Sequence, residues 1–207
     1  MKKLLYTFLA VSLIFSACEK EEEETNNNNN NNSALAIGDS HQGGIIFYLD
    51  GNGGGLVAAP TDQSFGIQWG CYETDIVGAA GTGIGAGVQN TIDIINAGCT
   101  PSDSLYNIYG DLTAADICAN LTLGGYSDWF LTSKDELNEM YVILHLQGLG
   151  DFAINTFDFN VDGYWSSSEY DISNAWLQNF NYGGQSRDYG KGQYNNANVY
   201  TRAVRAF

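Results

Sequence analysis

The feature that most limits what this chain can fold into is a polar segment close to its N-terminus. Residues 19–24 hold five glutamates and one lysine, and residues 26–32 are seven consecutive asparagines. Neither run contains the apolar side chains that a packed core needs, so both are expected to be disordered. The folded part of the 207-residue chain is therefore expected over residues 35–207, which is the length of one domain.

The residues before this segment have the organisation of an export signal. Two lysines precede an apolar run over residues 4–15, which is too short to span a bilayer as a mature helix. The run ends in Phe15-Ser16-Ala17-Cys18, which resembles the lipobox of bacterial lipoproteins, where cleavage before the cysteine accompanies its acylation. The resemblance implies a signal peptide over residues 1–17, lipidation of Cys18 and a membrane tether over residues 18–34. A plain secretory peptide with an incidental cysteine is the alternative.

The acidic run that follows Cys18 bears on the location of the protein. It resembles the surface-export signal of some Gram-negative lipoproteins, although a solvated spacer would have the same composition. We therefore expect a protein that is lipid-anchored in the bacterial outer membrane at the cell surface, with the outward and inward orientations of the domain both left open.

The charge balance excludes nucleic acid as a partner. The chain carries 8 basic and 24 acidic side chains, a net charge of −16, and 3 of the basic and 5 of the acidic residues precede residue 33. The remainder holds 5 basic and 19 acidic residues, which is a net charge of −14. Phosphate binding needs clustered lysines and arginines, which so few basic residues in so acidic a domain cannot provide.

Short strands and glycine turns are expected at both ends of the folded part. Residues 44–49 and 56–60 flank an Asn-Gly turn, which is the strongest short signal for a β-hairpin. A glycine-rich surface loop is expected over residues 78–87, and further strands are predicted over residues 67–70, 164–168, 175–180 and 199–207. Strands at both ends with helices between them predict an α+β domain, and the two ends can meet in one sheet.

Three helices are predicted between these strands. Asn90 is expected to cap the first, which ends at Gly98. Thr113 and Asp116 open the second, whose apolar face comprises Ala114, Ile117, Cys118 and Leu121. Ser133 and Glu136 form a capping box before the third, whose apolar stripe we assign to core packing and which comprises Leu137, Met140, Tyr141 and Leu144.

Several blocks of sequence resemble one family of bacterial surface domains. Residues 124–141, which read GGYSDWFLTSKDELNEMY, are similar to the signature of the Lcl C-terminal domain family, first described at the end of a collagen-like adhesin. Residues 164–169, 175–176 and 204–207 match further blocks in the same order, although Thr132 stands where the family usually has proline. The resemblance implies a C-type-lectin-like fold with short antiparallel strands, two or three helices and long loops. It also implies adhesion to host glycans, including sulfated ones.

The expected function is that of a surface-anchored binding or adhesion module for a glycan or glycoprotein. Because the excess of acidic residues would repel a sulfated polysaccharide, a neutral glycan, a protein or a Ca²⁺-bridged ligand fits the charge better. Sugar binding needs aromatic faces and planar polar groups, and one segment supplies them: Trp165, Glu169, Asp171, Asn174, Trp176, Gln178, Asn181 and Tyr182. Core tryptophans and a solvated polar loop are the alternative for these residues. The alternative function is a structural or protein-interaction domain of the cell envelope without glycan binding.

No cofactor is expected, and calcium is the one ion that the sequence raises. Oxygen ligands for it would come from Asp158, Asp162, Glu169 and Asp171, but the sequence lacks a loop with calcium-binding spacing. His41 and His145 have no cysteine or histidine at ligand spacing, which argues against zinc. No catalytic constellation is recognisable, so we expect a protein that is not an enzyme.

Export to an oxidising compartment predicts a disulfide among Cys71, Cys99 and Cys118. Cys118 shares the apolar face of the second predicted helix and is expected in the core. Cys71 and Cys99 have loop-like surroundings, so we predict that these two pair and close a loop of about thirty residues.

Overall fold

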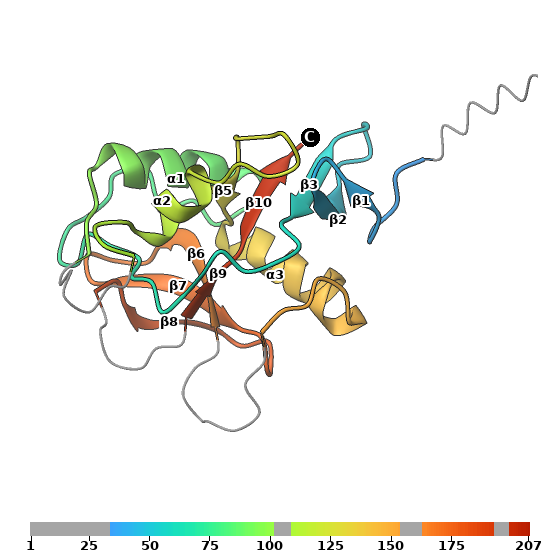
Figure 1. The fold of residues 1–207 in the computed structure, drawn as a ribbon. Helices are drawn as coiled ribbons and strands as arrows, with labels where there is room; N and C mark the ends of the chain where they lie inside the picture. The colour runs from blue at the N-terminus through green and yellow to red at the C-terminus, as the bar shows by residue number, and fades with distance from the viewer. Residues whose placement is uncertain (1–33, 102–108, 154–162, 193–198) are drawn as a thin grey trace, which may run out of the picture. The chain divides into compact units, whose positions relative to one another are not determined.

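The part of the chain that the structure describes contains two five-stranded sheets (Figure 1). This computed structural model describes residues 34–101, 109–153, 163–192 and 199–207. In spatial order the first sheet contains β1 (Ser40–His41), β2 (Gly44–Leu49), β3 (Gly55–Ala58), β10 (Ala203–Ala206) and β5 (Phe130–Leu131). The second contains β4 (Ser64–Phe65), β9 (Val199–Thr201), β6 (Gly163–Glu169), β7 (Asn174–Asn179) and β8 (Gln185–Gly190). The helices are α1 (Ala86–Asn96), α2 (Ala114–Ala119), α3 (Lys134–Ile143) and the short η1 (His145–Gln147), so the domain is α+β as predicted.

The first sheet brings both ends of the described domain together. The predicted hairpin forms as β2 and β3, which pair antiparallel. In its turn, Asp50 Oδ1 accepts the N–H groups of Asn52 and Gly54 at 2.7 and 3.0 Å. β10 pairs antiparallel with β3, and Phe207 and Gly55 exchange two backbone hydrogen bonds of 3.1 Å. The expected meeting of the two ends in one sheet is therefore confirmed.

The second sheet is built around β6, which is buried along its whole length. β6 pairs antiparallel with β7 and parallel with β9. Its three consecutive serines share one role, because each hydroxyl donates to a backbone carbonyl of another segment. The pairs are Ser166 with Trp176 at 2.8 Å, Ser167 with Thr132 at 3.0 Å and Ser168 with Gly81 at 2.6 Å. β6 therefore ties the glycine-rich loop and the start of α3 to the sheet.

The prediction of one strand over residues 199–207 is wrong in one respect, because the structure has two strands there, and they belong to different sheets. Arg202 lies between β9 and β10 and is 1% exposed. Its guanidinium donates to Asp62 Oδ1 at 2.7 Å and to the carbonyls of Ala59 and Gly150 at 2.9 and 2.7 Å. A buried cation needs such acceptors, and they lie where the chain passes from one sheet to the other, so the break falls at this arginine.

The predicted starts of α2 and α3 are confirmed. Ser133 Oγ accepts the Glu136 N–H at 3.3 Å, and Glu136 Oε2 accepts the Ser133 N–H at 2.7 Å. Thr113 and Asp116 form the same reciprocal pair before α2. The apolar stripe of α3 packs inward, with 0–1% exposure at Leu137, Met140 and Leu144.

α1 begins at Ala86, four residues before the predicted cap at Asn90. Its N-cap is Gly85, at φ 91°, and the Glu136 carboxylate accepts the Gly85 N–H at 2.7 Å. Asn90 lies inside the helix, 1% exposed, and its amide donates to Gly81 O at 2.7 Å. A contact from α3 therefore replaces the local cap that the sequence suggested. Gly98 lies just beyond the helix end at φ 67°, as predicted.

Residues 67–70 do not form the predicted strand, and the strand in this region is β4, which pairs with β9. The segment is buried through its side chains, because Ile67 and Trp69 belong to the core and Trp69 Nε1 donates to Ser166 O at 2.8 Å. Strands β1, β5 and β8 were not predicted.

The predicted disulfide is present between Cys71 and Cys99, whose Cα atoms lie 4.7 Å apart. Cys118 is the free thiol among the described cysteines and is fully buried. It lies in the hydrophobic core, and burial there raises the pKa of its thiol far above the ordinary value. Both parts of the cysteine prediction are confirmed.

Candidate functional site

Three of the eight predicted ligand residues belong to the interior. Trp165 is 2% exposed, and its Nε1 donates to a backbone carbonyl at 2.9 Å. Gln178 is 0% exposed and donates to Asn138 Oδ1 at 3.0 Å. Glu169 is 5% exposed and pairs with Lys191. We therefore correct the predicted set by removing these three, since a buried and internally bonded side chain offers no surface to a ligand.

Trp176 lies instead in a group of partly exposed rings and cations. Its ring meets that of Tyr170 edge to face, with centroids 5.6 Å apart. Lys134 Nζ lies 5.1 Å from the Trp176 ring centroid, and Arg187 Cζ lies 4.6 Å from the Tyr170 ring centroid. Tyr170 is 42% exposed and Trp176 is partly exposed. We call Lys134, Tyr170, Trp176 and Arg187 the aromatic–cation cluster.

Four separate elements position this cluster. Tyr170 follows β6, Trp176 lies in β7, Arg187 lies in β8 and Lys134 is the first residue of α3. The Lys134 N–H donates to Ser168 Oγ at 2.9 Å, and its carbonyl accepts Gln185 Nε2 at 2.9 Å. The helix start that carries the lysine is thus bonded to both β6 and β8, which holds the cation beside the tryptophan.

The remaining predicted ligand residues lie at the start of β7 and in the two turns that flank it. Asp171 Oδ1 accepts the N–H groups of Ser173 and Asn174 at 2.8 Å each. These bonds, chiefly the one from Ser173, hold the pKa of Asp171 below its usual range. Asn181 and Tyr182 follow β7, and Tyr182 is 74% exposed, the highest exposure of an aromatic side chain in the described ranges. Both turns therefore place polar or aromatic groups next to the strand that carries Trp176.

The accessible positive charge of the domain is concentrated at this cluster. Five basic residues follow residue 33, and the structure describes all of them. Three are internal, with 0, 1 and 8% exposure at Lys191, Arg202 and Arg205, and each pairs with a carboxylate. The two that reach solvent, Lys134 and Arg187, are both members of the cluster.

A buried ion pair fixes the end of β6 from which the cluster starts. Lys191 Nζ bonds Glu169 Oε1, donates to Thr74 O at 2.8 Å and lies 5.0 Å from the Trp69 ring centroid. Glu169 Oε2 in turn accepts the Ile76 N–H at 2.9 Å. The pair therefore joins β6 to the loop that follows Cys71, and Tyr170 continues directly from it.

Sequence reasoning found Trp176 but missed the other three members of the cluster. Tyr170 stands between two residues of the predicted set, and an aromatic ring at that position was the available signal. Lys134 and Arg187 come from elements distant in sequence, and only the packing of α3 and β8 against β7 brings them to the rings.

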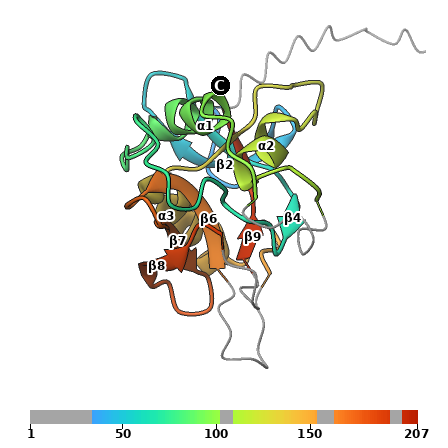
Figure 2. The ribbon, with the colours of Figure 1, turned by 90° about the vertical axis from the view of Figure 1, so that its left-hand side faces the viewer.

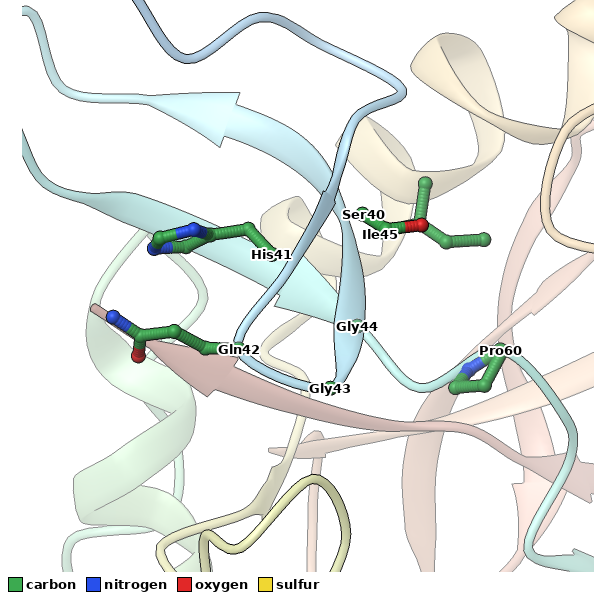
Figure 3. A pocket seen from close by; sticks show the side chains of 7 residues that line it. All are labelled: Ser40, His41, Gln42, Gly43, Gly44, Ile45 and Pro60. Atoms are coloured by element: carbon green, nitrogen blue, oxygen red, sulfur yellow. The ribbon is translucent and has the colours of Figure 1, made fainter. Parts of the chain in front are cut away.

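A second candidate site is a pocket of about 320 Å³ at the β1–β2 turn (Figure 3). It is lined by Ser40, His41, Gln42, Gly43, Gly44, Ile45 and Pro60. Figure 3 shows His41 and Gln42 pointing to one side of the hairpin and Ser40, Ile45 and Pro60 to the other. His41 is the one titratable lining residue, and its ring packs on that of Phe207 with centroids 4.6 Å apart. The pocket thus lacks a convergent set of charged groups.

Within residues 34–101, 109–153, 163–192 and 199–207, no three His, Cys, Asp or Glu side chains are grouped so as to hold a metal ion. Two of the considered calcium ligands, Asp158 and Asp162, lie outside the described residues, as does the predicted lipidation site Cys18. None of the described helices is long and apolar enough to cross a membrane.

Comparison with protein-family models and with curated proteins gives no match for this chain. Support for a function therefore comes from the geometry of the cluster and from the sequence resemblance.

Proposed function

We propose that the domain is a binding or adhesion module that recognises a glycan or a glycoprotein, held by a lipid anchor in the bacterial outer membrane. The observation that carries the proposal is the aromatic–cation cluster, in which two partly exposed rings meet edge to face between the two accessible cations. Ring faces pack against the C–H surfaces of sugars, while N–H groups donate to their hydroxyls. The resemblance of residues 124–141 to the Lcl C-terminal domain family, and with it a C-type-lectin-like fold, adds support.

Electrostatics favour a neutral ligand over a sulfated polymer. Lys134 Nζ lies 3.3 Å from Asp135 Oδ1, so one of the two cations is already paired. The folded part carries 19 acidic and 5 basic residues, and its field repels a polyanion within a screening length of about 10 Å at moderate salt. A glycan with hydroxyls and few charges meets no such repulsion.

The same groups favour binding over catalysis. The cluster has no serine, threonine or cysteine nucleophile beside a general base, and the amine of Lys134 is paired with Asp135 as a cation. The described free thiol, Cys118, is buried, and desolvation raises its pKa, so it is held as an unreactive thiol. We therefore propose that the protein acts without a chemical step and without a cofactor.

A glycan array probed with residues 34–207, with and without Ca²⁺, tests the proposal. Trp176→Ala is expected to weaken binding by about 2 kcal/mol, roughly thirtyfold, which is typical of a central aromatic contact. Tyr72→Ala is the matched control, since Tyr72 is 46% exposed and lies outside the cluster. Near-ultraviolet circular dichroism establishes that both variants fold.

The array has two outcomes that contradict the proposal. Binding that survives Trp176→Ala but is lost in Tyr72→Ala would move the site away from the cluster. Absence of binding to every glycan, together with an envelope protein that co-purifies, would favour the protein-interaction alternative. Binding that requires Ca²⁺ would instead assign an ion to the site.

The anchor is tested separately with Cys18→Ser in the full chain. This variant is expected to lose acylation and to leave the membrane fraction, because attachment depends on the acyl chains. Retention of the unacylated variant in membranes would contradict the lipid anchor. Protease treatment of intact cells then tests whether the domain faces outward.

A further inference from the structure

α1 exposes a row of aliphatic side chains on its outer face. Val88, Ile92 and Ile95 are 40, 43 and 37% exposed, and their spacing of four and three residues places them in one line along the helix. Ile84, just before the N-cap, is 40% exposed as well. α1 lies at the periphery of the domain in both views (Figure 1, Figure 2). We call these four residues the α1 row.

Asn90, Thr91 and Ile94 of this helix, rather than the aliphatic row, face the protein. Asn90 donates to Gly81 O at 2.7 Å and to Ser167 Oγ at 3.2 Å. Thr91 Oγ1 accepts the Leu131 N–H at 3.1 Å. These bonds are buried and specific, so the helix cannot rotate to bury the α1 row without breaking them. The exposed row is therefore a stable property of the fold.

The charge around this row differs from that of the rest of the domain. α1 has one charged residue in eleven, Asp93, whose Oδ1 accepts Gln89 Nε2 at 3.0 Å. The folded part as a whole carries 19 acidic against 5 basic residues, so two copies repel each other wherever acidic surfaces meet. The α1 row therefore offers two copies a contact between helices that each carry a single carboxylate.

A second aliphatic row shows the contrast. Val142, Leu146 and Leu149 are 41, 60 and 36% exposed, over α3 and η1. Asp135 and Glu139 lie seven and three residues before Val142 and continue the same helix face. Pairing of this row with its own copy would bring four carboxylates together, so it is disfavoured as a surface for self-association.

We propose that α1 is a self-association surface, on which a second copy of this chain packs its own α1 about a two-fold axis. One row is complementary to itself in this arrangement, and neutral side chains such as Gln89 and Asn96 flank it. A bilayer is a weaker candidate occupant, because a helix that lies on a membrane usually carries lysine or arginine beside its apolar face, and α1 has neither. The small size of the row places the contact among weak, transient interfaces.

Cysteine cross-linking of the full chain in its native membrane tests the proposal. Ile92→Cys, near the middle of the row, is expected to form a covalent dimer under mild oxidation. Leu146→Cys is the matched control, since Leu146 is 60% exposed and lies in the second row. The native cysteines of the described residues do not interfere, because Cys71 and Cys99 are paired and Cys118 is buried.

Two further measurements define the contact. The dimer yield of Val88→Cys is expected to be lost when Ile92→Glu is added, because the new carboxylates face each other across the axis. The dimer yield of Val88→Cys alone is expected to rise as the ionic strength is raised to about 1 M. The screening length then falls to about 3 Å, and repulsion between the acidic domains weakens. Near-ultraviolet circular dichroism of each variant confirms its fold.

Equal cross-linking of Ile92→Cys and Leu146→Cys would overturn the proposal, since it would report random encounters. Absence of any dimer, or an adduct of Ile92→Cys with a different protein, would overturn it as well. These outcomes are independent of glycan binding, which is measured at the aromatic–cation cluster.

Discussion

Replacement of Lys191 by methionine tests how much the buried ion pair contributes to folding. The Lys191 side chain is 0% exposed and that of Glu169 is 3% exposed. Loss of the ammonium leaves the Glu169 carboxylate buried without its cation and removes the 2.8 Å hydrogen bond to Thr74 O. Breaking a buried pair in this way costs about 3–5 kcal/mol in the free energy of unfolding. For a domain of this length that corresponds to a fall of roughly 6–20 °C in Tm.

Urea unfolding of residues 34–207, followed by tryptophan fluorescence, is the assay. Trp69 lies against the ammonium, with its ring centroid 5.0 Å from Nζ, so its emission reports on the site itself. Glu169→Gln is expected to be about as damaging, since it leaves the cation buried without a carboxylate. The double variant is expected to cost less than the sum of the two, by about 0.5–3 kcal/mol, because it removes both charges.

Lys134→Met is the matched control. Its ion pair with Asp135 is partly exposed, with side-chain exposures of 22 and 47%, and such pairs contribute about 0–1 kcal/mol. If Lys191→Met destabilised the domain no more than this control, the ammonium would not be buried. Strict additivity in the double variant would show that the two charges do not interact.

Three further predictions concern the disulfide, a buried carboxyl and a packed glycine. Replacing Cys71 and Cys99 by serine is expected to cost about 3–4 kcal/mol, from the loop entropy of a 28-residue separation, and an unchanged urea midpoint would contradict this. Burial, the largest influence on Glu136, raises the pKa of its carboxyl above the ordinary value of 4.5. The carboxyl's contribution to folding is thus full below pH 4.5 and lost as pH rises through the folded-state pKa. The native protein and Glu136→Gln differ in their free energy of unfolding, and this difference should increase in favour of the native protein as pH falls through that window. A decrease would show that the N–H groups bonded to the carboxylate outweigh burial. Gly87→Ala is expected to destabilise by about 1–3 kcal/mol despite the better helix propensity of alanine, because a Cβ there would clash with Glu136 Oε2 and would lie 2.9 Å from Leu131 O. A gain in Tm would refute the close packing.

Features set by neighbouring residues could be predicted from the sequence. The box at Ser133 and Glu136 joins partners three positions apart, so its residue types alone indicate the helix start. The hairpin of β2 and β3 follows from a short turn in the same way. Cys118 has the helical register of its apolar neighbours, and its burial left Cys71 and Cys99 to pair.

Features set by tertiary contacts could not be predicted in this way. β8 reads QSRDYG, without β-branched residues, and it is a strand because β7 offers it a hydrogen-bonding partner. Asn90 has the residue type of a cap, but its amide bonds a distant loop from within the helix. Trp165 and Trp176 look alike in sequence, and β6 is buried on both faces, so alternation gave no means of telling the core ring from the exposed one.

The distribution of positive charge accounts for the position of the candidate site. Arg202 bonds groups at the crossing between the sheets, and Lys191 joins β6 to a disulfide-bonded loop. Each buried cation needs a carboxylate and backbone acceptors, so these residues are bound to sites where distant segments meet. Only Lys134 and Arg187 are then left for the surface, and both lie over aromatic rings that stabilise them. A ligand at the aromatic–cation cluster therefore meets only two cations on an acidic domain, one of them already paired with Asp135, which suits a glycan with single acceptor groups better than a densely sulfated chain.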